Sequence, residues 1–234
     1  MLAGGLGTRL YPLTKITNKH LLPVYNRPMI YYPLLKMAEA GIKDVLIVTG
    51  GHHAGEFLRL LGNGKDFGLR LHYTYQEGEG GIADALALSE DFADNEPISV
   101  ILGDNIFQDS LLDMVRAYPG RGAMVVLKQV PDPERFGVPE FKGEKLVRIV
   151  EKPKESPSRF AITGVYFYDD QVFDIIRGLK PSERGELEIT DVNNRYIQMN
   201  QMSCFYMKGW WTDAGTFESL FRASVLVRKQ ELSR

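Results

Sequence analysis

Short apolar runs alternate with helical patterns through the first half of this 234-residue chain. Residues 44–49 (DVLIVT) and 98–104 (ISVILGD) have the composition of buried strands, and 70–76 (RLHYTYQ) alternates like a further strand. Helical patterns cover residues 81–92 and 110–118. Because neighbouring parallel strands need a crossover between them, usually a helix, this alternation predicts βαβ units around a mostly parallel sheet.

The second half of the chain has a different pattern. After residue 130 the strand-like stretches are shorter and separated by turns, as at 145–151 (KLVRIVE), which predicts a smaller antiparallel extension of the sheet. Helical patterns return at 170–178 and 186–200, and residues 216–229 are amphipathic. The sequence contains no repeat, low-complexity tract or linker. We therefore expect a single α/β domain over residues 1–234, Rossmann-like, with helices on both faces of a mostly parallel mixed sheet.

Charge and cysteine content exclude several classes of function. The formal net charge of −2 argues against a surface for nucleic acid or anionic membranes, since both normally need a basic excess. No stretch approaches the roughly 18 apolar residues of a membrane span. The single cysteine, Cys204, excludes an internal disulfide and a cysteine metal cluster, which fits a reducing compartment. We expect a cytoplasmic protein without nucleic-acid or membrane partners.

The first ten residues, MLAGGLGTRL, join an apolar start to a glycine-rich turn. Such turns after strands let backbone amides approach phosphate. The pattern GxxxxGK[ST] is absent, and the pattern GxGxxG fails because Leu10 stands in place of its last glycine and Pro12 follows. Arg9 and Lys19 instead supply two cations, which suits a triphosphate. The alternative is a tight turn with two solvated basic side chains.

Eight motifs follow one another along the chain: LAGGLGTRLYPLT, GGIADAL, ILGDNIF, PERFGV, EKPKE, TGVYFYD, RGELEITDVN and GWWTDAGT. Together they resemble the sugar nucleotidyltransferases, and among these the thymidylyltransferases, up to about residue 222. The resemblance implies transfer of dTMP from dTTP to α-D-glucose 1-phosphate, with release of pyrophosphate, in nucleotide-sugar synthesis such as the dTDP-rhamnose pathway to polysaccharides. It also implies that residues 1–130 mainly bind nucleotide and residues 131–222 mainly bind the sugar phosphate.

The resemblance assigns roles to single residues as well. Gln76 and Gly81 are expected at the nucleobase, and a glutamine amide can donate and accept as the edge of thymine or uracil requires. The stretch after Gln76 departs from the form of many relatives, so UTP remains an alternative to dTTP. The implied catalytic residues are Arg9, Lys19, Asp104, Lys152 and Asp213, and the implied nucleotide-binding residues are Leu2, Gly4, Gly5, Gly7, Thr8, Gln76 and Gly81.

Two acids are candidate metal ligands. Asp104 ends a predicted strand and Asp213 stands before small residues in TDAG, and either could simply cap a helix. Two carboxylates in a phosphate pocket more often hold Mg²⁺ between themselves and substrate oxygens. The resemblance implies that Asp104 and Asp213 are both magnesium ligands.

A second group of residues is expected at the sugar phosphate. Lysine suits a phosphate and glutamate suits sugar hydroxyls, and the resemblance assigns these roles to Lys152 and Glu151 in EKPKE. The alternative is a solvated turn. The family resemblance also places Gly137 and Val165 in the sugar pocket. Further candidates are Glu186 and Asp191, which either cap a helix or support the site, and Trp211, which either walls the pocket or packs in the core.

Three functional hypotheses remain open from the sequence. The first hypothesis is a magnesium-dependent thymidylyltransferase, which could form a homo-oligomer. The second is the same chemistry with UTP or with another sugar 1-phosphate. The third is a catalytically silent protein that binds nucleotide sugars. Because relatives carry a few more residues before LAGG, we also expect a clipped start with a stub of a first strand, and feedback control through a longer C-terminal section is not expected.

Overall fold

The computed structural model describes residues 1–51 and 53–233 and divides the chain into two compact units. The first unit contains Met1–Glu79, Ile101–Asp113 and Gly209–Arg234. The second contains Gly80–Val100 and Met114–Lys208. Strand β6 (Ile98–Ile101) and helix α5 (Leu111–Ala117) each cross from one unit into the other.

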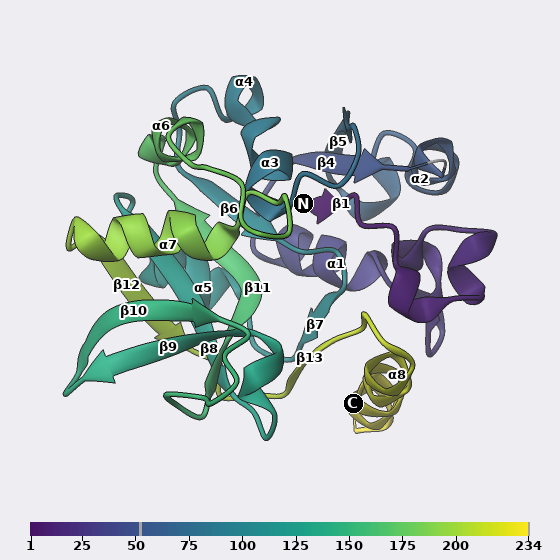
Figure 1. Ribbon diagram of the computed structural model, residues 1–234. Coiled ribbons are helices and arrows are strands. Elements are labelled where there is room, and N and C mark those ends of the chain that lie inside the picture. The colour runs from purple at the N-terminus through teal and green to yellow at the C-terminus, as the bar shows by residue number, and fades with distance from the viewer. Residues whose placement is uncertain (52, 234) are drawn as a thin grey trace. The chain divides into compact units, whose positions relative to one another are not determined.

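The first unit is built on a parallel sheet with the strand order β1-β4-β5 (Figure 1). Its strands are β1 (Leu2–Ala3), β4 (Asp44–Gly50) and β5 (Arg70–Gln76). All of β4 after Asp44 is buried, as expected for an apolar strand covered on both faces. Leu2 pairs with Val48 on one side and bridges Leu102 on the other, so the two-residue β1 lies inside the sheet.

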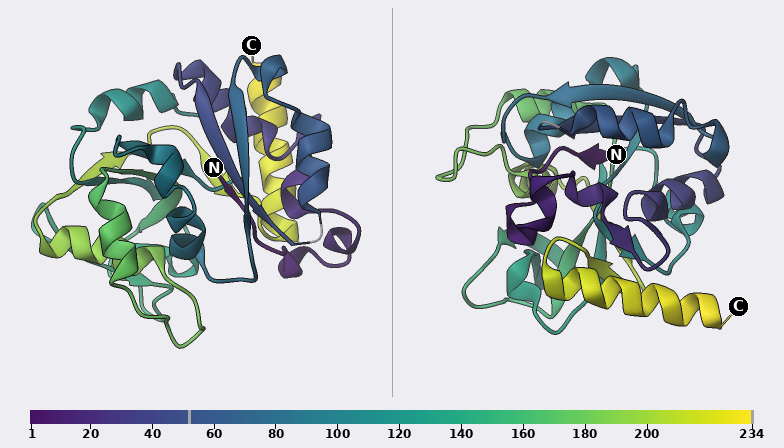
Figure 2. Two further views of the ribbon diagram at one scale, coloured as in Figure 1. Left: turned by 90° about the horizontal axis from the view of Figure 1, so that it is seen from above. Right: turned by 90° about the vertical axis from the view of Figure 1, so that its right-hand side faces the viewer.

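Helices and short strands complete the first unit. Helix α8 is the longest and is seen lengthwise in the right-hand view of Figure 2. Its Thr216 and Ser219 form a reciprocal capping box, and Ala223 and Val227 pack in a core cluster with Ile106. The elements are β2 (Pro23–Val24), β3 (Arg27–Pro28), α1 (Tyr31–Glu39), α2 (Ala54–Leu61), β7 (Asn105–Phe107), β13 (Trp211–Asp213), α8 (Phe217–Leu232) and 3₁₀ turns at Thr8–Leu10, Leu13–Lys15, Lys19–Leu21 and Lys65–Phe67.

The second unit contains a mixed sheet with the strand order β12-β8-β11-β6. Strand β8 pairs parallel to β12 and antiparallel to β11, and the β8–β11 register shifts between Ile162 and Tyr166. A separate antiparallel hairpin is formed by β9 and β10. The elements are α3 (Ile82–Ala87), α4 (Glu90–Ala93), β8 (Ala123–Gln129), a 3₁₀ turn at Pro133–Arg135, β9 (Gly137–Lys142), β10 (Lys145–Glu151), β11 (Phe160–Tyr168), α6 (Gln171–Arg177), α7 (Ile189–Gln198) and β12 (Met202–Tyr206).

The expected α/β class is confirmed, with three corrections to the elements. The helix expected at 81–92 is divided into two helices. The first, α3, ends at Ala87, and α4 begins at Glu90. Between them the Ser89 hydroxyl donates a hydrogen bond to the Leu86 carbonyl. The helix expected at 186–200 begins at Ile189, after an extended Glu188. The antiparallel extension is partly a hairpin of its own rather than part of the larger sheet. Among the described residues, no helix is both long and apolar enough to cross a membrane.

Candidate functional site

The glycine loop after β1 lies against two side chains that the sequence singled out. A Cβ on Gly4 would stand 2.8 Å from Gln76 Oε1, and a Cβ on Gly7 would stand 2.9 Å from Lys19 Cβ. Gly7 also has a φ of +68°, a conformation that other residues rarely adopt, and its carbonyl accepts a hydrogen bond from Thr14 Oγ1. The loop therefore needs glycine for close approach, and it holds Gln76 and Lys19 beside its backbone.

The neighbouring predicted positions belong to the same loop. A Cβ on Gly5 would lie 3.7 Å from Lys19 Nζ, and Thr8 begins the 3₁₀ turn that contains Arg9. Leu2 is buried in β1, so its side chain supports the sheet and only its backbone could face a ligand. Gln76 is buried at the end of β5, with its amide against the loop. The stretch from Gly4 to Arg9 thus combines a glycine-rich backbone with a cation.

Lys19 and Asp104 form a short ion pair in the first unit. Lys19 Nζ lies 2.6 Å from Asp104 Oδ2, and the two side chains are 14% and 11% exposed. Burial by itself would raise the pKa of the Asp104 carboxyl, but the charge of Lys19, that of His20 and the hydrogen bonds from Lys19 and Asn105 lower it well below its usual range. Asp104 is therefore a carboxylate at neutral pH.

Asp213 and Arg9 meet Asp104 at Gly215. The position that a Cβ would occupy on Gly215 is 3.0 Å from Arg9 Nη2, 3.3 Å from Asp213 Oδ2 and 3.5 Å from Asp104 Oδ2. Strand pairing explains the convergence, since Asp213 on β13 faces Asn105 on β7, directly after Asp104. The Ala214 amide also donates to the Asp104 carbonyl at 2.9 Å. Two carboxylates and one guanidinium, from three distant parts of the sequence, thus come within 3.5 Å of one point beside Gly215, which carries no side chain.

His20 is a buried neighbour of this cluster. Its ring packs on Gly103, where a Cβ would lie 2.8 Å from His20 Cδ2, and Asn18 Oδ1 lies 2.7 Å from His20 Nδ1. Burial and the nearby charge of Lys19 lower the pKa of His20 to about 3, although Asp104 acts in the opposite direction. The imidazole is therefore neutral at neutral pH.

The acids at Gly215 fit a magnesium ion. Mg²⁺ prefers hard oxygen ligands and is commonly held by one or two carboxylates together with substrate phosphates and waters. Asp104 and Asp213 offer such oxygens on two sides of the side-chain-free volume at Gly215. Within residues 1–51 and 53–233, no group of three or more histidine, cysteine, aspartate or glutamate side chains could hold a metal ion by itself. Substrate oxygens and waters would have to complete the coordination.

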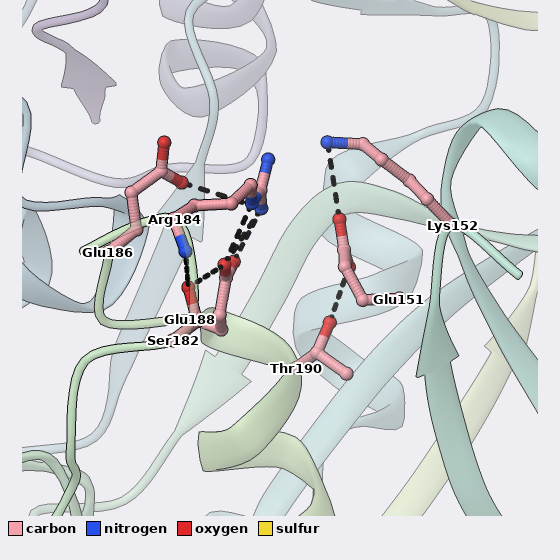
Figure 3. A network of polar contacts seen from close by, with 7 residues as sticks. All are labelled: Glu151, Lys152, Ser182, Arg184, Glu186, Glu188 and Thr190. Atoms are coloured by element: carbon pink, nitrogen blue, oxygen red, sulfur yellow. Dashed lines mark hydrogen bonds and ion pairs between the residues drawn. The ribbon is translucent and has the colours of Figure 1, made fainter.

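The second unit carries the residues expected at the sugar phosphate. Glu151 pairs with Gly137 across the β9–β10 hairpin, and a Cβ on Gly137 would stand 3.5 Å from Glu151 Oε2. Thr190 Oγ1 donates to Glu151 Oε2 at 2.6 Å, and Lys152 Nζ lies 3.4 Å from Glu151 Oε1 (Figure 3). Lys152 has a φ of +41°, a conformation that is uncommon for a residue other than glycine and that clusters at ligand sites. Its amide donates to the Phe136 carbonyl at 3.0 Å.

An arginine lies among carboxylates in the same network. Arg184 Nη2 donates to both carboxylate oxygens of Glu188, at 2.8 and 2.9 Å, and lies 3.4 Å from Glu186 Oε2 (Figure 3). Ser182 Oγ donates to Glu188 Oε1 at 2.8 Å. Partial burial and the charges of Glu188 and Glu151 raise the pKa of Asp191. Glu186 and Glu188 thus form an acidic loop that Arg184 partly neutralises, and Asp191 lies in the first turn of α7 directly after it.

The remaining predicted residues of the second unit lie in distinct surroundings. Gly81 has a φ of +94° and stands against the acidic loop, where a Cβ would be 2.6 Å from the Leu187 carbonyl. Val165 is fully buried, so its side chain packs in the core and only its backbone is available to a ligand. It belongs to the part of β11 where the register with β8 shifts, a local distortion that often accompanies binding sites.

Sequence reasoning did not single out several residues of these clusters. Gly215 lies where Arg9 approaches the two aspartates. The sequence feature that could have pointed to it is the run of small residues after Asp213 in TDAG. Arg184, Glu188 and Thr190 all lie in the motif RGELEITD, of which only Glu186 and Asp191 were singled out from the sequence, as helix caps or as support for the site. For Trp211, which the sequence placed either at the pocket wall or in the core, the structure shows a buried ring whose N–H donates to Asn105.

Comparisons with known proteins show which family the chain belongs to. A family model described as nucleotidyl transferase matches residues 1–230. Glucose-1-phosphate thymidylyltransferase from Neisseria meningitidis serogroup A is 44% identical over 97% of this chain and 81% of its own length. The protein of the same name from Mycolicibacterium smegmatis is 45% identical over 99% of this chain and 82% of its own length.

Solved structures of nucleotidyltransferases have a fold similar to that of this chain. A candidate glucose-1-phosphate thymidylyltransferase from Bacillus anthracis, crystallised with a sucrose, has a TM-score of 0.93 and 52% identity and covers 97% of this chain and 93% of that one. UDP-glucose pyrophosphorylase complexed with UDP-glucose has a TM-score of 0.87 and 26% identity, covering 98% of this chain and 97% of that one.

Proposed function

Because the chain belongs to the nucleotidyl transferase family, we propose that it transfers dTMP from dTTP to α-D-glucose 1-phosphate and releases pyrophosphate. In this reaction a phosphate oxygen of the sugar phosphate attacks the α-phosphorus of the nucleotide. The bond between the α-phosphorus and the bridging oxygen breaks, and pyrophosphate leaves with that oxygen. The protein need not form a covalent intermediate, so positioning and charge neutralisation supply the acceleration.

The convergence of Arg9, Asp104 and Asp213 at Gly215 is the observation that carries the proposal. A triphosphate brings several negative charges, and an arginine beside a glycine loop offers it a forked donor and exposed backbone amides. Arg9 is the proposed contact for the leaving pyrophosphate, and Lys19, 2.6 Å from Asp104, the second cation for the phosphates. Gln76, held against Gly4, is the proposed contact for the thymine edge.

Asp104 and Asp213 are the proposed ligands of Mg²⁺. When bound, the ion would neutralise charge on the phosphate oxygens during the transfer. The lowered pKa of Asp104 keeps its carboxylate ready for such a cation, since no proton has to be displaced. Gly215 leaves the space between the two carboxylates and Arg9 open.

The second unit supplies the proposed site for glucose 1-phosphate. Lys152, half exposed beside Glu151, is the proposed cation for the sugar phosphate. Glu151 can accept hydrogen bonds from sugar hydroxyls, and the hydrogen bond from Thr190 fixes one of its oxygens. Gly137 gives room beside that carboxylate, and the Val165 backbone is a further proposed contact. In this assignment residues 131–222 mainly serve the sugar phosphate, and the reaction takes place in the cytoplasm, in agreement with the single cysteine.

Pyrophosphate release over a matrix of substrates tests this function. The matrix would combine dTTP, UTP, CTP and GTP with glucose 1-phosphate and its epimers, in the presence of Mg²⁺. We expect the highest kcat/KM for dTTP with glucose 1-phosphate. A higher value for UTP would replace the nucleotide in the proposal, and binding of dTDP-glucose without release from any pair would favour the catalytically silent protein.

A further inference from the structure

A chain of two hydrogen bonds joins a buried tryptophan to the Asp104 carboxylate. Trp211 Nε1 donates to Asn105 Oδ1 at 2.7 Å, and Asn105 Nδ2 donates to Asp104 Oδ1 at 3.0 Å. Trp211 is 8% exposed and Asn105 is 3% exposed, so water competes little for these bonds. All three residues belong to the first unit.

The tryptophan decides which way the asparagine amide points. An amide has an oxygen end that accepts and a nitrogen end that donates, whereas an indole N–H can only donate. The Asn105 oxygen must therefore face Trp211, and its nitrogen then faces Asp104. With the amide reversed, the Asn105 oxygen would stand against the carboxylate and two acceptors would repel each other. Trp211 thereby keeps a donor on Asp104 Oδ1.

The same strand carries this tryptophan and the second acid. Trp211 and Asp213 are two residues apart on β13, which places both side chains on one face of the strand. Strand β13 pairs antiparallel with β7, so that Asp213 faces Asn105 and Trp211 faces Phe107. One strand thus brings Asp213 to Asp104 and also brings the donor that fixes the amide next to Asp104.

We propose that Trp211 is a positioning residue that acts through Asn105 to fix the orientation of the Asp104 carboxylate for the divalent cation. This inference rests on the metal role of Asp104 in the proposed function. Asp104 Oδ1 is held by Asn105 and Oδ2 by Lys19, so the carboxylate plane is set from both sides. Partners of metal ligands commonly change metal affinity by about 10- to 100-fold when they are removed. Trp211 does not touch the substrates in this role.

Binding of Mn²⁺ alone, followed by electron paramagnetic resonance, tests the proposal without turnover. Trp211→Phe keeps an aromatic ring but removes the N–H, and we expect about a tenfold weaker affinity for Mn²⁺. In steady-state assays kcat should fall by a similar factor, whereas KM for glucose 1-phosphate should change less than about twofold. Trp210→Phe is the matched control, because Trp210 is the other tryptophan of the chain, packs against the core cluster of Ile106 and donates its backbone amide to Gln108 Oε1. This control should bind Mn²⁺ like the wild type.

A double-mutant cycle separates positioning from packing. In an Asn105→Ala background the relay is already broken, so adding Trp211→Phe should weaken Mn²⁺ binding no further. All variants would be compared at a temperature at which circular dichroism shows them folded. Unchanged Mn²⁺ affinity in Trp211→Phe, or an equal loss in both backgrounds, would overturn the proposal while leaving the metal site intact. A wild type that does not bind Mn²⁺ would overturn the metal assignment with it, and failure of the function itself would appear in the pyrophosphate assay.

Discussion

The Lys19–Asp104 ion pair of the first unit is largely buried and short, whereas the Lys152–Glu151 pair of the second unit is more exposed and longer. Lys19 and Asp104 are 14% and 11% exposed and lie 2.6 Å apart. Lys152 and Glu151 are 50% and 31% exposed and lie 3.4 Å apart. Opposite charges interact more strongly away from water, and exposed pairs are weakened by solvent and salt.

This difference fits two kinds of ligand. A metal-bound triphosphate presents the same phosphate groups in every cycle, so the largely buried Lys19–Asp104 pair can match it with little rearrangement. A sugar phosphate presents hydroxyls that need individual partners, and half-exposed Lys152 and Arg184 side chains can move to meet them. We therefore expect substitutions in the first unit to reduce turnover and those in the second to weaken sugar-phosphate binding.

The largest effect is expected for Asp104→Asn. The substitution removes a carboxylate from the proposed metal site while keeping its shape, and turnover should fall by about 100-fold or more. Measurement of kcat at saturating Mg²⁺ checks this. Asp113→Asn, an exposed acid on α5, is the matched control and should keep normal turnover. Near-normal turnover of Asp104→Asn at saturating Mg²⁺ would remove this residue from the metal site.

Lys152→Ala should have the next largest effect, and in a different parameter. Loss of a charged hydrogen bond to the sugar phosphate should raise KM for glucose 1-phosphate by about 10- to 100-fold, with a smaller change in kcat. Initial rates over a range of glucose 1-phosphate concentrations measure it. Lys154→Ala, which removes a nearby exposed lysine, should leave KM unchanged. If kcat alone fell in Lys152→Ala, the contrast between the two units would be wrong.

Gly215→Ala tests the open volume at the meeting point of the first unit. The added methyl would stand 3.0 Å from Arg9 Nη2 and 3.3 Å from Asp213 Oδ2, so these groups would have to shift by a few tenths of an ångström. We expect about a tenfold loss of kcat, because small displacements of catalytic groups are costly. Gly55→Ala is the control, since a Cβ there meets nothing within 4 Å. Equal activity of the two variants would show that the volume at Gly215 is not used.

The smallest effect concerns stability against pH. His20 has a pKa of about 3 when buried, against about 6.5 when unfolded, so the unfolded chain binds a proton in this range and the folded protein does not. Stability should therefore decrease as pH falls from about 6.5 towards 3, by at most about 1.4 kcal/mol per pH unit from this group. Urea unfolding at several pH values should show a shallower decrease for His20→Gln.

The pH dependence of stability should also differ between the two units, because the pKa of Asp104 is lowered and that of Asp191 is raised. The lowered pKa of Asp104 makes its contribution to stability persist above its unfolded pKa and disappear as pH falls through the folded value. The raised pKa of Asp191 acts in the opposite sense, since protonation at lower pH relieves the cost of its partial burial and its repulsion by Glu188 and Glu151. Hydrogen exchange at decreasing pH should accordingly show the first unit losing protection before the second. Simultaneous loss in both units would contradict this.

Much of the first unit could be predicted from local pattern. The apolar run 44–49 became β4, the alternating run 70–76 became β5, and the proline after the glycine loop correctly excluded an α-helix there. Strand 98–104 was predicted too long, because β6 ends at Ile101 and the chain turns before Asp104. Periodicity reports which residues are apolar, but it does not report where backbone hydrogen bonds stop.

The candidate site was predicted in its residue types but not in its contacts. Arg9, Lys19, Asp104 and Asp213 were chosen for their chemistry and for a family resemblance, and their common neighbour Gly215 became evident from strand pairing. The pairing of Arg184 with Glu188 and of Thr190 with Glu151 depends on how a loop folds back on a hairpin. No local spacing contains that information, since the partners Thr190 and Glu151 are 39 residues apart.

The amino-acid sequence by itself determined the alternation of strands and helices, the glycine loop and the supply of cations and acids, because these depend on local composition and periodicity. The tertiary structure alone decided which of them touch: that Lys19 reaches Asp104, that β13 brings Asp213 beside it, and that Trp211 turns the Asn105 amide toward the carboxylate. The physical reason is that burial and strand pairing join residues that are far apart in the chain. Charges become fixed, and pKa values shift, only where such contacts exclude water.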